Sequence, residues 1–287
     1  MNGILLADKP SGWTSNDVVC KMKGVLHERR IGHSGTLDPM ATGLLPLFIG
    51  KATKAVEFAE KNIKKYIAGI SFGIVTDTQD ISGNIISEEQ SSVTVQEFMK
   101  AADAFTGEID QIPPMYSALK QNGKRLYDLA RQGIEVERKP RTVNIESIEL
   151  ISAYESGFVF SVVCSAGTYV RTLCHDIGQY LGCGACMSSL RRTGCGGFSI
   201  NKAYTLDQII EADKQGKIES LLLPADSLFS EISRYTCSET EEKYIKNGRQ
   251  LKTELPEGEY AVYSCSGEFL MLAEAENGVL KSRKNFF

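Results

Sequence analysis

The sequence has no long apolar run and few of the residues that build metal sites. No apolar stretch approaches the ~20 residues that a helix needs to cross a bilayer, and the first ten residues, MNGILLADKP, lack the basic-then-apolar order of a signal peptide. Only three histidines occur among 287 residues. We therefore expect a cytoplasmic protein that does not interact with membranes.

Cysteine is present but is poorly placed for its two common structural uses. Eight cysteines in a chain of this length, without a secretory signal, are expected to be reduced thiols. The one close pair, Cys183 and Cys186, forms a single CxxC motif, whereas a structural zinc site would need a second pair or histidines at ligand spacing. We therefore expect no bound metal, although a thiol-metal protein remains one class to test.

Positive charge is scarce overall but concentrated locally. The formal net charge of −4 and the pI of about 5.6 argue against a protein that coats nucleic acid through a wholly basic surface. Residues 120–141 nevertheless carry seven lysines and arginines against three acidic residues, and Arg191 and Arg192 form a second basic cluster. Taken alone, such runs are also typical of a solvated face.

The hydrophobic pattern predicts an α+β domain in which strands and helices are mixed. Strands are predicted by alternation or by β-branched and aromatic residues in GILLAD (3–8), LLPLFIG (44–50), KYIAGISFGI (65–74), TVNIESIELI (142–151) and GFVFSVVCS (157–165). Helices are predicted by apolar residues at helical spacing over 18–26, 95–105 and 170–181, the second capped by Thr94 and ended by Gly107.

A shift in pattern near residue 230 predicts a second, smaller unit. Ser238 and Glu241 have the spacing of a capping box, Gly248 can end the helix, and three short strand candidates follow. We therefore divide the chain into a large domain over 1–230 and a small β-rich domain over 231–287.

The stretch GHSGTLDPMATGLLP, residues 32–46, holds a single carboxylate, Asp38. Its glycines and prolines predict a loop that enters the next strand. An Asp before Pro is most often a turn residue that bonds nearby backbone N–H groups. If Asp38 is buried, it needs a partner to stay ionised, and Arg171, on the first turn of a predicted helix, could hold it bidentately and lower its pKa.

Two tyrosines lie at the ends of predicted elements. Tyr66 begins the apolar face of a strand, together with Ala68, Ile70, Phe72 and Ile74, and Tyr169 precedes a helix. Such tyrosines are usually core aromatics with a hydroxyl at the rim. An enzyme that modifies a base can instead use them to stack on the extruded base. The residues alone thus leave open an Asp-dependent enzyme, an RNA-binding module and a thiol-metal protein.

Several motifs in a fixed order resemble those of one family. The sequence GHSGTLDPMATGLLP resembles the catalytic motif of the TruB family of tRNA pseudouridine synthases. In family order it follows LLADKPSGWTSND and precedes KKYIAGISFGIVTDTQDISG, PPMYSALK, CSAGTYVRTLCHDIG and LGCGACMSSLRRTGCGGF. The resemblance covers about 230 residues, and co-ordered motifs are far more specific than any one of them.

The resemblance implies a mixed, mainly antiparallel sheet flanked by helices and a C-terminal PUA-like RNA-binding domain. It implies isomerisation of the T-loop uridine of tRNA, at tRNA position 55, to pseudouridine, without a cofactor. The resemblance also assigns roles to single residues. Asp38 is the nucleophile, on the sugar or on the base, and Arg171 is its partner, with Tyr169 packed beside it. Tyr66 stacks on the base and accepts a proton, Leu190 lies under the base, and His33 helps displace the neighbours of the flipped nucleotide.

The partner implied is the T arm of tRNA, with the chain acting as a monomer and without a protein partner. Lys124, Arg125 and Arg141 are then expected to meet phosphates. The sequence departs from the family at Ser34, where Thr is usual and a hydroxyl is kept, and at Cys186, where a non-thiol is expected. The alternative function is a tRNA-binding chaperone whose catalysis is incidental or absent.

Overall fold

A mixed ten-stranded sheet forms the body of the protein, whose computed structural model describes residues 1–121 and 123–287. The strand order is β14 (Tyr204–Thr205), β1 (Gly3–Lys9), β3 (Thr42–Ile49), β12 (Ala185–Cys195), β4 (Lys64–Phe72), β11 (Gly157–Cys164), β10 (Arg141–Tyr154) and β7 (Gly107–Gln111), with β2 (Ile31–His33) beside β3 and β13 (Phe198–Ser199) beside β12. Only β1–β14 and β3–β12 among these pairs are parallel. The predicted mixed, mainly antiparallel sheet is confirmed.

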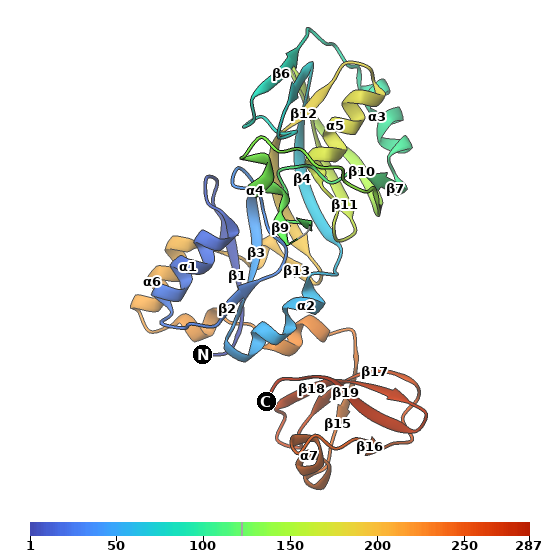
Figure 1. The fold of residues 1–287 in the computed structure, drawn as a ribbon. Coiled ribbons are helices and arrows are strands. Elements are labelled where there is room, and N and C mark those ends of the chain that lie inside the picture. The colour runs from blue at the N-terminus through green and yellow to red at the C-terminus, as the bar shows by residue number, and fades with distance from the viewer. Residues whose placement is uncertain (122) are drawn as a thin grey trace.

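Two pairs of helices cover different parts of this sheet (Figure 1). Helices α1 (Ser15–Val25) and α6 (Leu206–Lys214) pack on β1 and β3, where their side chains form one apolar cluster. Helices α3 (Val95–Ala104) and α5 (Val170–Tyr180) pack on β4, β10, β11 and β12 around a second cluster. The chain between β2 and β3, which carries Asp38, contributes Leu37 and Ala41 to the second cluster.

Local signals placed most of these elements correctly. The N-cap predicted at Thr94 forms a capping box with Glu97, and Ser238 forms one with Glu241. The predicted end of α3 is wrong, since the helix stops at Ala104 and Gly107 begins β7. Val95, expected on its inner stripe, lies exposed on the first turn.

Two glycines explain where strand predictions were wrong. Gly73 has φ +80°, which breaks the strand predicted to run through residue 74, so Ile74 begins the separate strand β5 (Ile74–Thr76). Strand β3 begins earlier than expected and includes Gly43, which has φ +104°. A Cβ at Gly43 would lie 2.3 Å from the carbonyl oxygen of Arg192 on the neighbouring strand β12. Only glycine allows β3 and β12 to approach so closely.

Short elements connect the larger ones. They are α2 (Val56–Ala59), β6 (Ile85–Glu88), which pairs with β5, the hairpin β8 (Lys120–Gln121) and β9 (Lys124–Arg125), α4 (Leu126–Ala130), and 3-10 turns at Gly50–Ala55, Ile200–Lys202, Ile218–Leu221 and Ala225–Phe229.

The C-terminal part forms its own five-stranded sheet. Its order is β15 (Ser233–Thr236), β17 (Gly258–Tyr263), β18 (Phe269–Glu276), β19 (Val279–Asn285) and β16 (Leu251–Lys252), with α7 (Glu239–Lys246) beside it. Four strands follow Gly248, where three were expected, because the two-residue β16 gives too short a pattern to detect. The β-rich character is confirmed, whereas the boundary at residue 231 stays a prediction.

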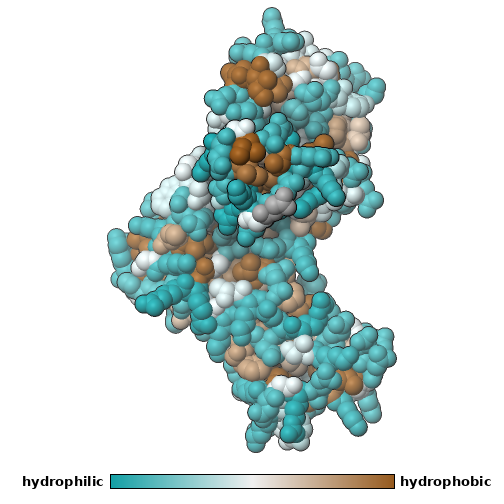
Figure 2. All heavy atoms as spheres, viewed as in Figure 1, coloured by the Kyte–Doolittle hydropathy of each residue, from teal (hydrophilic) through white to brown (hydrophobic). Residues whose placement is uncertain are grey.

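An aromatic cluster joins this C-terminal lobe to the body. The rings of Phe229, Phe269 and Phe286 lie with centroids 4.9–5.9 Å apart, within the apolar cluster that also contains Phe48 and Leu44 of β3. Figure 2 shows a hollow between the two parts and a mainly hydrophilic surface with separate apolar patches. No helix within residues 1–121 and 123–287 is long and apolar enough to cross a membrane.

Candidate active site

The loop between β2 and β3 is tied to the segment that follows β1. The Nζ atom of Lys9, a fully buried residue, donates to the carbonyl of Pro39 at 3.3 Å, and the N–H of Gly12 donates to the same oxygen at 2.8 Å. The hydroxyl of Ser15 accepts from the N–H of Leu37 at 2.9 Å. These contacts hold the backbone on both sides of Asp38.

Asp38 lies against Arg171, as the sequence predicted, but the geometry differs. One terminal nitrogen of Arg171 donates to Oδ1 of Asp38 at 3.2 Å and to the carbonyl of Tyr116 at 2.7 Å. The other lies 3.8 Å from Oδ2 of Asp80. The expected bidentate pair is therefore wrong, because the guanidinium is shared between two carboxylates and a carbonyl. The Arg171 side chain is 5% exposed and that of Asp38 is 29% exposed, so the carboxylate remains accessible.

Asp80 is a member of this network that sequence reasoning missed. Its Oδ1 accepts from the N–H of Ser82 at 2.9 Å and from the hydroxyls of Thr78 and Ser82. The carboxylate is thus fixed by its own turn, with Oδ2 left to face Arg171. The stretch TDTQDISG contained this signal, but a buried Asp in a polar turn cannot be told from a solvated one by sequence.

Burial sets the pKa of Asp38. Loss of water contact raises the pKa of this carboxyl above its ordinary value, and the positive charge of Arg171 opposes that effect without cancelling it. Asp80 adds to the rise and Lys9 opposes it. Arg171 lowers the pKa of Asp38 as the sequence predicted, but desolvation outweighs this effect and the pKa is raised overall.

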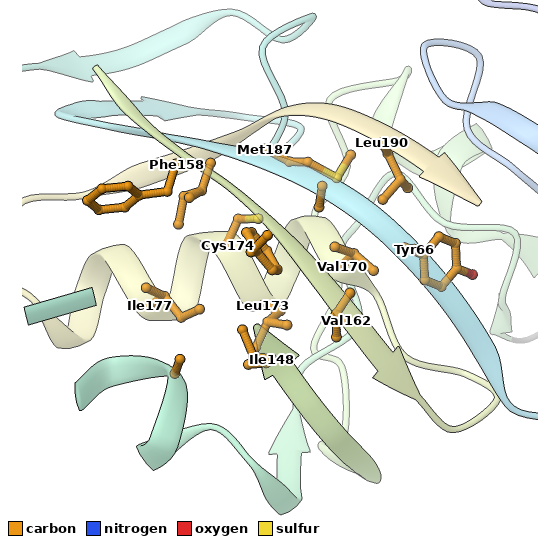
Figure 3. Close-up of a cluster of buried hydrophobic side chains, with 14 of the residues drawn as sticks. Tyr66, Ile148, Phe158, Val162, Val170, Leu173, Cys174, Ile177, Met187 and Leu190 are labelled. Atoms are coloured by element: carbon orange, nitrogen blue, oxygen red, sulfur yellow. The ribbon is translucent and has the colours of Figure 1, made fainter. Parts of the chain in front are cut away.

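Tyr66 and Leu190 lie in the same apolar cluster as the residues that flank Asp38. Tyr66 is on β4 and Leu190 on β12, and Figure 3 shows Tyr66 at one end of the cluster, with its hydroxyl directed away from the apolar side chains. Burial raises the pKa of Tyr66 to about 12, with the charge of Arg192 acting in the opposite direction. The ring therefore offers an apolar face and a protonated phenol.

Tyr169 is the N-cap residue of α5 and is fixed by Gln111. The side-chain amide of Gln111 donates to the carbonyl of Tyr169 at 3.2 Å, and its oxygen accepts from the N–H of Tyr169 at 3.0 Å. The ring centroid of Tyr169 lies 5.8 Å from the Arg171 guanidinium carbon. Tyr169 therefore packs beside the ion pair.

His33 lies on β2, ahead of the loop. It is half-buried, and its Nδ1 has no hydrogen-bond partner within the described residues. Burial lowers the pKa of His33, and the positive charge of Arg192 lowers it further. The imidazole is therefore neutral near pH 7, which suits contact with an aromatic base.

The basic residues predicted to meet phosphates lie on an exposed hairpin and the strand after it. Lys124 and Arg125 form β9, and Arg141 begins β10. The N–H of Tyr127, just after the hairpin, donates to the carbonyl of Ser117 at 3.1 Å, next to the Tyr116 carbonyl that holds Arg171. The hairpin is thus joined through one short segment to the site.

No group of three or more His, Cys, Asp or Glu side chains within residues 1–121 and 123–287 is arranged to hold a metal ion. Cys186 is buried on β12 and Cys183 is half-buried, and both are free thiols.

Comparison with known proteins shows the family to which the chain is similar. The model of the TruB family pseudouridylate synthase (N terminal domain) matches residues 23–170, and that of the tRNA pseudouridylate synthase B C-terminal domain matches residues 171–230. A tRNA pseudouridine synthase B from Azoarcus sp. (strain BH72) is 44% identical over 285 residues, covering 99% of this chain and 94% of the relative. One from Alkaliphilus oremlandii (strain OhILAs) is 45% identical, covering 88% of this chain and 83% of the relative.

The fold is also that of solved structures. A chain in the crystal structure of a Cbf5-Nop10-Gar1 complex superposes with a TM-score of 0.78 at 25% identity, covering 99% of this chain and 85% of that one. The sheet, its helices and the matched sequence define a pseudouridine synthase, which is an isomerase. Within that class, the chain belongs to the TruB family of pseudouridylate synthases.

Arg171→Lys should lower the turnover number about 100-fold, because an ammonium cannot reach Asp38, Asp80 and the Tyr116 carbonyl together. The measurement is single-turnover pseudouridine formation. Arg191→Lys is the matched control, since Arg191 pairs with Asp8 through two contacts of 2.7 and 3.1 Å but is 42% exposed. Equal losses in the two variants would contradict a special role for Arg171.

The catalytic efficiency should fall as the pH is lowered, with an apparent pKa above the ordinary Asp value of about 3.9. A raised pKa means that Asp38 takes up a proton at a higher pH than a solvated Asp and then cannot act as an anion. We would measure kcat/KM between about pH 4.5 and 8, with RNA binding and folding monitored in parallel. A constant kcat/KM across that range would contradict the elevated pKa.

Proposed function

We propose that this enzyme converts the T-loop uridine of tRNA, at tRNA position 55, to pseudouridine, with Asp38 as the nucleophile. The observation that carries the proposal is the ion pair of Asp38 with Arg171, in which the cation is buried and the carboxylate is accessible. The relatives of known name are tRNA pseudouridine synthases, which supports tRNA as the substrate.

The chemistry requires a group that can bond to carbon and leave again. A carboxylate can form such a covalent intermediate and so divide one difficult step into two easier ones. Desolvation makes Asp38 more reactive than a carboxylate in water, while Arg171 keeps it oriented. Attack on the ribose carbon and attack on the base both remain compatible with this arrangement.

The surroundings of Asp38 suit an extruded uridine. Leu190 and the ring of Tyr66 provide apolar surfaces for the base, and we assign Tyr66 as the proton acceptor at the base carbon. Neutral His33 is proposed to help displace the neighbours of the flipped nucleotide. Flipping costs a few kcal/mol and is easier from a loop than from a paired stem, which favours the T loop.

The exposed hairpin with Lys124 and Arg125, together with Arg141, is proposed to contact phosphates of the T arm. We further infer that the lobe over 231–287 acts as a PUA-like RNA-binding domain, and that the chain works as a cytoplasmic monomer without a protein partner. The eight free thiols suit a reducing compartment.

Asp38→Asn should abolish isomerisation, by at least about 1,000-fold, while tRNA affinity changes only several-fold, because the nucleophile is lost and the shape is kept. The measurement is tritium release from a T-arm stem-loop labelled at carbon five of its uridines. Retained turnover would remove Asp38 from the mechanism. Binding without release from either protein would favour the alternative of a tRNA-binding chaperone.

Lys124→Gln with Arg125→Gln should weaken tRNA binding and reduce the slope of log K against log salt by roughly 1 to 2, since each phosphate contact contributes about 1. A matched pair of neutralised lysines, Lys214 and Lys217 in and after α6, should leave the slope unchanged. If the wild type, the hairpin variant and the control variant all gave the same slope, the hairpin would be an ordinary solvated face.

A further inference from the structure

Arg192 is a buried cation that has no counter-ion within residues 1–121 and 123–287. It lies on β12 and is fully buried. Its Nε donates to the carbonyl of Leu44 at 2.6 Å and one terminal nitrogen donates to the carbonyl of Gly35 at 3.0 Å. Among the described residues it has no carboxylate within 4.0 Å, and its second terminal nitrogen is buried without a hydrogen-bond partner. An unpaired buried charge is costly, so its retention needs an explanation.

One consequence of this placement concerns the loop of Asp38. Gly35 lies in that loop and Leu44 lies on β3 just after it, so the guanidinium holds the chain on both sides of the nucleophile. A Cβ at Gly35 would lie 3.1 Å from the terminal nitrogen of Arg192 that holds it. The local backbone is therefore built around this side chain.

A second consequence concerns Tyr66. Arg192 and Tyr66 are register partners on neighbouring strands, so their side chains lie on one face of the sheet. The titratable groups that face Arg192 are Lys9 of β1, His33 of β2, and Lys64 and Tyr66 of β4. Of these four, only Tyr66 can become an anion. The groups that face Tyr66 are Arg192 together with the thiols Cys164 and Cys195.

We propose that Arg192 is a positioning residue for the isomerisation: it holds both ends of the Asp38 loop and stabilises negative charge on the Tyr66 oxygen during proton transfer. The inference rests on the proposed function, in which Tyr66 takes the proton. The tyrosine is the group that acts on the base, and Arg192 acts through it.

The proton balance fits this assignment. When the uracil ring is rejoined to the ribose through carbon five, that carbon must lose one proton, and the electrons of its C–H bond restore the ring double bond. The ring nitrogen that left the ribose must gain one proton. Tyr66 can first give its phenolic proton to the nitrogen, directly or through water, and then take the proton from carbon five as a phenolate, so that it ends unchanged. Negative charge on that oxygen is transient, which is the condition under which a fixed cation helps most.

Burial disfavours the phenolate form of Tyr66. The pKa of the phenol is raised to about 12 by burial, even with the charge of Arg192 acting against this rise. Arg192 lowers the pKa of Tyr66 both through its charge and through a hydrogen bond, and one of its terminal nitrogens has no other partner among the described residues.

The test is a double-mutant cycle between Arg192 and Tyr66 on full-length protein and a T-arm stem-loop. Arg192→Lys should lower single-turnover kcat about 10- to 100-fold with RNA affinity kept within several-fold, and should increase the primary isotope effect from deuterium at carbon five. In a Tyr66→Phe background the same change should have a clearly smaller effect, because only the contacts with the Asp38 loop are then weakened. A fluorinated, more acidic tyrosine at position 66 should recover part of the rate of Arg192→Lys.

Arg191→Lys is the matched control, because Arg191 is the neighbouring cation on β12 but its guanidinium pairs with Asp8. It should change neither the isotope effect nor the pH profile. If Arg192→Lys proves unstable, Arg192→Gln is carried through the same cycle. If the Arg192 substitution lowers the rate equally in the wild-type and Tyr66→Phe backgrounds, Arg192 only holds the loop, and the proposal is overturned. Absence of tritium release from the wild type would refute the proposed function, and this inference with it.

Discussion

Three buried cations fix the loop that carries Asp38, and the rest of the site depends on them. Lys9 holds the carbonyl of Pro39, Arg192 holds that of Gly35, and Arg171 holds the Asp38 carboxylate itself. A loop of this length without regular hydrogen bonds would otherwise sample many conformations, at a cost of about 1–2 kcal/mol per residue to order. Charge-assisted hydrogen bonds in a dry environment provide the orientation that a nucleophile needs.

Burying several charged groups in one site costs free energy, and this cost explains how Arg171 is placed. Burial lowers the pKa of Lys9 to about 8, while the negative charge of Asp38 opposes this fall and the carbonyls of Pro10 and Trp13 accept from its Nζ. Asp38 and Asp80 partly balance the positive charges, but the two carboxylates also raise each other's energy through like-charge repulsion. Sharing Arg171 between them is the geometry that relieves this conflict, and a purely bidentate pair with Asp38 would leave Asp80 buried without a cation.

The sequence predicted those parts of the molecule that depend on neighbours along the chain. Helix α5 could be predicted because apolar residues recur along it at helical spacing, and the buried side of β4 followed from alternation. The residues of the site came from a resemblance in motif order. The roles of Lys9 and Arg192 could not be predicted, since their partners are backbone carbonyls, which every residue has and which packing alone selects.

The difference in exposure between the two ion-pair partners has a consequence for catalysis. Arg171 is 5% exposed and does not depend on substrate for its position, whereas Asp38 keeps 29% of its side chain open to water. A nucleotide placed over Asp38 would remove that remaining water, which would strengthen the attraction to Arg171 and at the same time make the carboxylate a better nucleophile. Reactivity would then rise further when the base is in place. This dependence on the bound base is useful to an enzyme that breaks a glycosidic bond in RNA. A carboxylate that was fully activated in the free protein would not be limited to the one loop that the enzyme recognises.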